Sequence, residues 1–429
     1  MWAGAGPRVQ YTVTPHEYQL EPIATIAEAL RRGHAVIDAS DTGVGKTVHA
    51  LFAAKETGTS LGVICPKSVV HRWRETAEEI GVPLKFCINV EKFKRSNFVQ
   101  SSPKGRVWKW AMPPYGADAV VFDEVHRFGS PTSQNGRMLA ACPATAVMLS
   151  ATAAESPTQM RAIGSKLGLT TWKGWHNWCL ANGCRLGNFG GLEYVGGPGG
   201  MSELHRQIFD EGMGCRVRKA DVVGFPKERI STTSVGVSNT RVLDKAYMEE
   251  LQAKELDAEN ALTAQIHASQ ISEHLMLPAV IELMQNSLTE GNVPVVFCNF
   301  RESIVQIQNA FPDAAVIQGG QVGDFRKNEV ERLRNRTAPV AAVMIQAGGT
   351  GLDGLQDEVG DAVREGFIFP GWHAKDLIQA LGRLPRANTK SFVQQWLLYA
   401  ADTLGSRKRK KMNVKIKNIE TLNDGDLAL

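Results

Sequence analysis

Short apolar runs alternate with helical stretches along most of the 429-residue chain. In the first half, the run HAVIDA at 34–39 precedes the helical stretch KTVHALFAAKE at 46–56. In the second half, VPVVFCNF at 293–300 follows the helical stretch LPAVIELMQNSLTEGN at 277–292. Apolar runs of this length predict buried strands, and their alternation with helices predicts an α/β fold with parallel sheets.

The segment DASDTGVGKT, Asp38 to Thr47, joins the first such strand to its helix. Strand, glycine-bearing loop and helix are the context of a phosphate-binding loop, although Ser40 stands where G-x-x-x-x-G-K-[ST] has its first glycine. Glycines let several N–H groups face one anion, the lysine reaches the β- and γ-phosphates, and the threonine hydroxyl ligates Mg²⁺. A chance glycine-rich turn is the alternative. The residues expected to bind nucleotide here are Thr42, Gly43, Val44, Gly45, Lys46 and Thr47.

A second acidic motif follows the apolar run at 119–122, in the sequence Asp123-Glu124-Val125-His126. A carboxylate at the carboxyl end of a parallel strand lies beside the phosphate loop of an α/β sheet. We expect Asp123 to hold Mg²⁺, and Glu124 to accept a proton from the attacking water or to orient it. An acidic turn at a strand end is the alternative for the motif taken alone.

Composition narrows the partner and the compartment only a little. The formal charge of +4, from 48 basic and 44 acidic residues, permits a nucleic-acid partner without demanding one. The seven cysteines form no dense framework, which favours a reduced, intracellular compartment. We find no signal-peptide core and no apolar run of about 18 residues, so we expect no membrane span.

The ordered set of motifs resembles that of superfamily 2 helicases and translocases with a D-E-x-H box, and its closest likeness is to Swi/Snf-type motors, possibly in a compact viral or phage form. HEYQLEPI at 16–23 resembles the segment upstream of the phosphate loop, which implies that Gln19 reads the adenine edge; a solvated helix residue is the alternative. PKSVVHRW at 66–73 resembles the motif in which Lys67 and Ser68 contact a nucleic-acid backbone.

The same resemblance assigns coupling and second-half residues. VMLSATAAESP at 147–157 resembles the segment in which Ser150 and Thr152 link the ATP site, through His126, to the nucleic-acid track. AGGTGLD at 347–353 and QALGRLPR at 379–386 are similar to motifs of the second half, where two arginines stabilise charge on the γ-phosphate. By this resemblance Thr350 contacts nucleic acid, the nucleotide-binding residues are Gly351, Asp353 and Gln379, and the catalytic arginines are Arg383 and Arg386.

The resemblance implies two tandem RecA-like parallel-sheet lobes, with ATP and Mg²⁺ between them. We expect the first lobe at 1–233, the second at 234–401, and a basic, helical C-terminal tail at 402–429. The glycine- and tryptophan-rich stretch at about 172–214 is expected to be an irregular insertion or a pair of short hairpins in the first lobe.

The insertion leaves two questions open. Trp172, Trp175 and Trp178 stack on bases or, as we favour, pack the insertion against its lobe. A zinc site is a further possibility, although the spacing fits no standard pattern. Its ligands would be His176, Cys179, Cys184 and Cys215.

The motifs together predict a nucleic-acid-stimulated ATPase that moves along or remodels DNA, with duplex or branched DNA as the favoured track. The DNA preference follows from the likeness to Swi/Snf-type enzymes. An RNA helicase is one alternative. A non-cycling, ATP-gated nucleic-acid clamp or assembly factor is another, but it would predict a degenerate Asp123-Glu124 pair or missing arginines.

Overall fold

The computed structural model divides the chain into two units, the first running to Val222 and also taking in the chain from Lys417, the second being Val223–Ile416. The ranges that the structure describes are 13–102, 107–110, 116–187, 190–256, 258–321, 325–348, 354–360, 362–401, 410 and 412–419. Each unit is built on its own six-stranded sheet.

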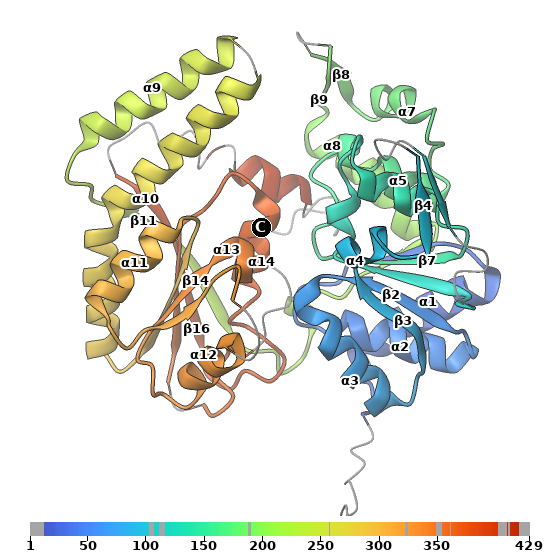
Figure 1. Ribbon diagram of the computed structural model, residues 1–429, viewed down its shortest axis with the longest axis horizontal. Helices are drawn as coiled ribbons and strands as arrows, with labels where there is room; N and C mark the ends of the chain where they lie inside the picture. Colours follow the sequence, from blue (N-terminus) through green and yellow to red (C-terminus); the bar gives the residue numbers. More distant parts are fainter. Residues whose placement is uncertain are drawn as a thin grey trace, which may run out of the picture. The chain divides into compact units, whose positions relative to one another are not determined.

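The sheet of the first unit is parallel throughout, and its strands do not follow the order of the chain (Figure 1). Parallel neighbours need crossover connections, which the intervening helices supply. In spatial order the strands are β10 (Gly214–Cys215), β1 (Val36–Asp38), β7 (Thr145–Leu149), β6 (Ala119–Asp123), β2 (Leu61–Cys65) and β3 (Leu84–Asn89).

Alternate residues of these strands point to opposite faces, and each face carries its own layer of helices. On β6, for example, Ala119 and Val121 join one core cluster while Val120 and Phe122 join the other. The first face is covered by α1 (Leu20–Arg32), α2 (Lys46–Thr57) and α3 (Val70–Ile80) (Figure 1). The second face is covered by α4 (Val90–Lys94), α5 (Gln134–Ala140), α6 (Arg161–Leu167) and α8 (Gly197–His205).

The stretch at 172–214 contains more helix than the sequence indicates. It holds α7 (Trp175–Ala181), one antiparallel hairpin of β8 (Cys184–Leu186) with β9 (Leu192–Tyr194), then α8 and a π-helical turn at Arg206–Asp210. Its last residue, Gly214, already belongs to β10 of the main sheet. A second hairpin, β4 (Val99–Ser101) with β5 (Trp108–Trp110), lies earlier in the unit.

The second unit repeats the plan, with parallel pairing between all neighbouring strands. Its strand order is β11 (Glu228–Val235), β16 (Val393–Ala400), β15 (Arg364–Ile368), β12 (Val293–Cys298), β14 (Ala341–Met344) and β13 (Ala315–Ile317). Its helices are α9 (Thr240–Leu256), α10 (Ala258–Thr289), α11 (Arg301–Ala310), α12 (Phe325–Arg334), α13 (Ile345–Gly348) and α14 (Ala374–Leu381). The predicted fold class, two parallel-sheet lobes with helices, is confirmed.

The segment between β11 and β12 forms a pair of helices. α9 and α10 run side by side (Figure 1) and bury Leu243, Tyr247 and Ala268 between them. None of the described helices is long and apolar enough to cross a membrane. Short 3₁₀ segments lie at Glu17–Gln19, Lys67–Val69, Val125–Phe128, Pro157–Gln159 and Lys219–Asp221.

The division between the units falls earlier than residue 233, the limit that the sequence suggests. β11 pairs with β16 along its whole length, from Glu228 to Val235, and so lies in the sheet of the second unit. Residues 412–419 are helical. Of the basic run at 407–411, only Lys410 lies within the described residues.

Candidate active site

The carboxyl ends of three adjacent strands bring the acidic residues of the first unit into one row. Asp38 of β1 and Asp123 of β6 are both in register with Leu149 of β7, which lies between them. By the strand alternation, both carboxylates point to the face that α2 and α3 cover. This is the edge at which open α/β sheets build their ligand sites.

The loop predicted to bind phosphate adopts, at two positions, a backbone conformation that requires glycine. Gly43 and Gly45 adopt φ of 90° and 102°, values that side chains other than glycine rarely tolerate. A Cβ at Gly45 would also lie 2.2 Å from Nε2 of Gln19. Within the described part of the chain, the backbone N–H groups of residues 43–47 donate to no acceptor. A row of available N–H donors at a helix start fits a phosphate chain.

Ser40 has a structural role in this loop, and glycine is not required at this position. Its φ is not positive, so glycine is not needed here. The buried Ser40 hydroxyl accepts a hydrogen bond of 2.9 Å from the N–H of Val217, which follows β10. The N–H of Ser40 in turn donates to Asp38 at 2.9 Å. The serine therefore fixes the start of the loop to its neighbouring strands.

Asp41 provides a second anchor for the loop. Its carboxylate accepts 2.9 Å bonds from the guanidinium of Arg216 and from the N–H of Lys219, and Arg216 also donates to the carbonyl of Ala39. Burial opposes ionisation of Asp41, but Arg216 and the Lys219 N–H outweigh it, so the pKa of Asp41 lies below its ordinary value. The loop is thus held by the segment after β10.

Beneath the loop, Asp38 and His49 form a fully buried pair. Nδ1 of His49, from the first turn of α2, lies 2.7 Å from Oδ2 of Asp38. Burial opposes ionisation of Asp38, yet His49 and Lys46 outweigh it and lower the pKa of Asp38. A paired, hydrogen-bonded charge at this depth fixes the loop against α2.

Lys46 folds onto its own loop. Its ammonium donates to the carbonyls of Ser40 and Asp41 at 2.8 and 2.9 Å. Burial lowers the pKa of Lys46, and the nearby carboxylates, including Asp38, Glu124 and Asp123, act to raise it. The contact of Lys46 with phosphate oxygens stays a prediction, and such contact would compete with these two bonds.

Asp123 and Glu124 stand where the strand β6 ends. Asp123 Oδ1 accepts from the N–H of Glu124 and Oδ2 from the indole N–H of Trp73, each at 2.9 Å. Burial and the charge of Glu124 raise the pKa of Asp123 to about 6. Glu124 has a φ of 54°, the left-handed region, in which a residue other than glycine is strained. Strain of this kind gathers at functional sites, where surrounding contacts hold it.

The predicted coupling residues lie together. Nδ1 of His126 lies 3.0 Å from the Ser150 hydroxyl, 3.5 Å from that of Thr152 and 3.3 Å from Oε2 of Glu124. Ser150 also donates its N–H to the carbonyl of Asp38 at 3.0 Å. A continuous set of contacts therefore runs from Glu124 to the segment after β7.

The residues present fit MgATP. Hydroxyl and carboxylate oxygens, the groups that Thr47 and Asp123 supply, are the ligands that Mg²⁺ prefers. The N–H groups of residues 43–47 and the ammonium of Lys46 match the negative charge of a triphosphate. The role of each residue stays a prediction.

Gln19, Lys67 and Ser68 lie at the edges of this site. The amide of Gln19 donates to the Val44 carbonyl at 2.8 Å and accepts from the N–H of His16 at 2.9 Å. Its contact with adenine stays a prediction, and such contact would compete with these bonds. Lys67 and Ser68 are exposed on the 3₁₀ turn between β2 and α3, as a nucleic-acid contact would require.

The second unit places its predicted residues on α14 and the turn after it. Gln379 and Arg383 are buried, and Gly382 ends the helix. The turn is fixed by Thr389, whose hydroxyl accepts from the N–H of Arg386 at 2.9 Å. The other residues predicted in this unit, Thr350, Gly351 and Asp353, lie outside the described residues.

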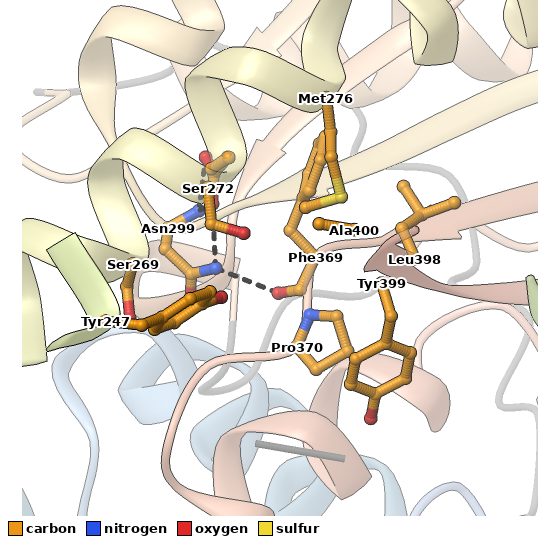
Figure 2. A pocket seen from close by; sticks show the side chains of 11 residues that line it. Tyr247, Ser269, Ser272, Met276, Asn299, Phe369, Pro370, Leu398, Tyr399 and Ala400 are labelled. Atoms are coloured by element: carbon orange, nitrogen blue, oxygen red, sulfur yellow. Dashed lines mark hydrogen bonds between the residues drawn. The ribbon is translucent and has the colours of Figure 1, made fainter. Parts of the chain in front are cut away.

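A small pocket of the second unit lies at the carboxyl ends of β12, β15 and β16 (Figure 2). The Asn299 amide donates to Glu273 and to the carbonyl of Phe369, at 2.9 and 2.8 Å. Glu273 also accepts from the Ser303 hydroxyl at 2.6 Å, and burial raises its pKa. The cavity volume of ≈ 10 Å³ is enough for about one water molecule, so this pocket is too small for a nucleotide. Its hydrogen bonds join Glu273 of α10 to Asn299, which follows β12.

The tryptophans of the stretch at 172–214 pack inward. Trp172 and Trp178 contact the core of the first unit, and the Arg161 guanidinium lies 4.1 Å from the ring centre of Trp172 and 5.1 Å from that of Trp175. This arrangement agrees with the packing interpretation.

The four residues considered for zinc do not form one cluster. Cys215 belongs to β10 and is paired with Asp38, while His176 is exposed on α7. The Cys179 thiol donates to the carbonyl of Pro157 over 3.6 Å, and the neighbouring thiol of Cys184 raises the pKa of Cys179. Among the described residues, no group of three or more His, Cys, Asp and Glu side chains is placed to hold a metal ion.

Four groups that the sequence analysis did not single out belong to this site: His49, Trp73, Asp41 and Arg216. Two of them carried a weak signal. Asp41 lies inside the loop, and Arg216 starts the basic sequence RVRK. His49 and Trp73 look like ordinary helix residues, and only the tertiary fold reveals their carboxylate partners.

Comparisons with known proteins find a relative that this chain matches over most of its length. No family model matches the chain. It is 26% identical over 457 residues to a protein of Acanthamoeba polyphaga mimivirus named "Putative ATP-dependent RNA helicase", covering 96% of this chain and 84% of the relative. A Sulfolobus solfataricus SWI2/SNF2 ATPase core in complex with dsDNA is 13% identical, with a TM-score of 0.39, over 96% of this chain and 97% of that one.

The first of these similarities extends over nearly the whole chain, as the ordered motifs do. Those motifs lie at the carboxyl ends of parallel strands, with the acidic box beside the phosphate loop. The chain is similar over nearly its whole length to a putative ATP-dependent RNA helicase of Acanthamoeba polyphaga mimivirus, and its ordered motifs resemble those of superfamily 2 helicases and translocases with a D-E-x-H box, in particular the Swi/Snf-type motors.

Proposed function

We propose that the protein is an Mg²⁺-dependent ATPase that is stimulated by nucleic acid and translocates along DNA, with duplex or branched DNA as its track. The observation that carries the proposal is the convergence of Lys46, Asp123 and Glu124 at one edge of the first sheet, with His126 and Ser150 bonded beside them.

Each predicted site residue of the first unit has a role in binding or hydrolysing ATP. The N–H groups of the loop and the Lys46 ammonium bind the phosphates, and Asp123 with Thr47 would hold Mg²⁺. Bound Mg²⁺ neutralises charge on the phosphate oxygens. Glu124 orients the attacking water and accepts its proton, since a carboxylate held close to His126 can hand that proton on.

Arg383 and Arg386 of the second unit complete hydrolysis. A guanidinium is planar, carries several donors and stays charged, so it suits the charge that develops on the γ-phosphate. An arginine in this role typically raises the rate 10³- to 10⁵-fold. Gln379, one turn before Arg383 on α14, binds the nucleotide in this proposal.

Lys67 and Ser68 contact the backbone of the nucleic acid. Their exposure, and their place just before α3, suit donation to phosphates. His126, Ser150 and Thr152 carry the state of the ATP site toward this track. The likeness of 66–73 and 347–353 to Swi/Snf-type segments is the ground for preferring DNA.

RNA is the second candidate track, because the mimivirus relative is named an RNA helicase. A non-cycling clamp is less well supported, because the Asp123-Glu124 pair and both arginines are present.

The test is the steady-state ATPase rate compared on single-stranded DNA, duplex DNA, forked DNA and RNA, all in Mg²⁺. We expect duplex or forked DNA to give the highest rate and Glu124→Gln to bind ATP but not turn it over. Stimulation by RNA alone would move the assignment to an RNA helicase. ATP binding without turnover on every track would favour the clamp.

A further inference from the structure

Trp73 joins α3 to the acidic motif by a hydrogen bond. Its side chain is 1% exposed and packs in the core between the sheet, α2 and α3. Its indole N–H donates to Asp123 Oδ2 over 2.9 Å. The strand alternation explains this contact, because residues 119, 121 and 123 of β6 point to the face that α3 covers.

Packing alone does not explain the choice of acceptor. A buried indole N–H needs one acceptor, and any backbone carbonyl can serve. Trp110 in the same unit shows the ordinary solution, since its buried N–H donates to the carbonyl of Met138 over 2.9 Å. At Trp73 the acceptor is instead a carboxylate of the D-E-x-H box.

The bond leaves Asp123 oriented and still able to accept further ligands. Each of its oxygens takes one donor, Oδ1 from the N–H of Glu124 and Oδ2 from Trp73. A carboxylate oxygen can accept two contacts, so both keep a lone pair for another partner. Two donors from different elements fix the plane of the carboxylate, and a misplaced ligand plane weakens a metal site.

The exposed residues Lys67 and Ser68 lie just before the start of α3, and Trp73 lies in the first turn of that helix. Pro66 and the 3₁₀ turn Lys67–Val69 separate β2 from this helix. The helix is also held at its middle, where the Arg74 guanidinium donates to the Cys87 carbonyl of β3 at 2.8 Å. A force on the start of α3 is therefore carried by a rigid element to Trp73.

We infer that Trp73 is a positioning residue that holds the Asp123 carboxylate for a magnesium nucleotide and couples that carboxylate to the position of α3. The inference rests on the proposed function, because it assigns Asp123 to Mg²⁺ and the start of α3 to nucleic acid. It adds a route from the track to the metal ligand that is separate from the contacts of His126.

The experiment compares Trp73→Phe with Trp110→Phe, since each substitution removes one buried indole N–H from the same unit. Binding of a fluorescent ADP analogue is titrated with Mg²⁺ and with EDTA, and the ATPase rate is measured with and without duplex DNA. We expect Trp73→Phe to weaken binding in Mg²⁺ roughly tenfold. Binding in EDTA should stay unchanged, and stimulation by DNA should fall. Trp110→Phe should leave all three quantities as in the wild type.

Two outcomes overturn the inference: equal binding and stimulation in both variants, or equal losses in Mg²⁺ and in EDTA. A wild type that shows no magnesium-dependent nucleotide binding would instead refute the proposed function. If Trp73→Phe does not fold, the replacement Trp73→3-benzothienylalanine keeps the ring shape while removing the N–H. The same titration is then made on that variant. Weaker nucleotide binding in Mg²⁺ alone would support the inference, and unchanged binding would refute it.

Discussion

At the scale of single residues, the phosphate loop depends on side chains outside the glycine pattern. Asp41 accepts from both Arg216 and the N–H of Lys219, and Ser40 accepts from Val217. These hydrogen bonds fix the loop to the segment after β10. Asp41 and Arg216 are 175 residues apart in the sequence. Its shape in the absence of phosphate comes from these bonds.

Asp41→Asn is expected to lower the thermal stability at pH 7. The variant loses a charge-assisted bond to Arg216, a loss of roughly 1–2 kcal/mol, or a few degrees in Tm. The folded pKa of Asp41 is depressed, so its contribution is present above the unfolded pKa and disappears as pH falls through the folded pKa. The difference in Tm between the variant and the wild type should therefore become smaller below about pH 4.

Thermal unfolding scans between pH 7 and pH 3.5 measure this difference. Asp221→Asn is the matched control, because Asp221 pairs with Arg218 on the exposed surface and should contribute little. A difference that stays constant with pH, or an equal loss in the control, would show that Asp41 does not anchor the loop by its charge.

The sequence predicted the residues whose chemistry is local and missed those whose partners come from the fold. Lys46, Asp123 and Ser150 each follow an apolar run, so their place at a strand end could be inferred. Trp73 carries no such signal, because a tryptophan on a helix usually belongs to the core. Its acceptor is 50 residues away in sequence, and only the strand order brings the two together.

At the scale of elements, the strands and the loops that follow them were predictable, and the stretch at 172–214 was not. Buried parallel strands leave continuous apolar runs such as those of β6 and β12. The stretch at 172–214 is rich in glycine and aromatic residues and lacks periodicity, so its sequence does not predict α7 and α8. Their helical form depends on packing against the core of the first unit.

Trp172→Ala is expected to destabilise the first unit without weakening DNA binding. The half-buried ring packs on the core and stacks on Arg161, so its removal should lose about half of the 3–5 kcal/mol typical of a fully buried tryptophan. Tm should fall while the Kd for forked DNA stays within twofold of the wild-type value.

Calorimetry and a fluorescence-anisotropy titration measure the two quantities. The exposed neighbour His176 gives the control variant His176→Ala, which should change neither. A weaker Kd for Trp172→Ala at unchanged Tm would revive the stacking interpretation of the tryptophans.

At the scale of the whole molecule, the chain repeats one plan twice, and the predicted catalytic residues are divided between the repeats. The first unit carries the loop and the acidic box, and the second carries the segment with Gln379, Arg383 and Arg386. The sequence indicated both repeats, because each motif follows a buried strand. It set the boundary too late, since β11 is polar and half-buried and lacks the apolar run of a central strand.

Hydrolysis that needs both repeats is the central claim, and single-turnover ATP hydrolysis by Arg383→Ala tests it most directly. We predict a rate at least 10³-fold below the wild type, with the Kd for ATP within about threefold. Arg334→Ala, which removes an arginine paired with Glu358 in the same unit, should hydrolyse ATP like the wild type. Hydrolysis by Arg383→Ala at the wild-type rate, with Lys46→Ala inactive, would contradict the account.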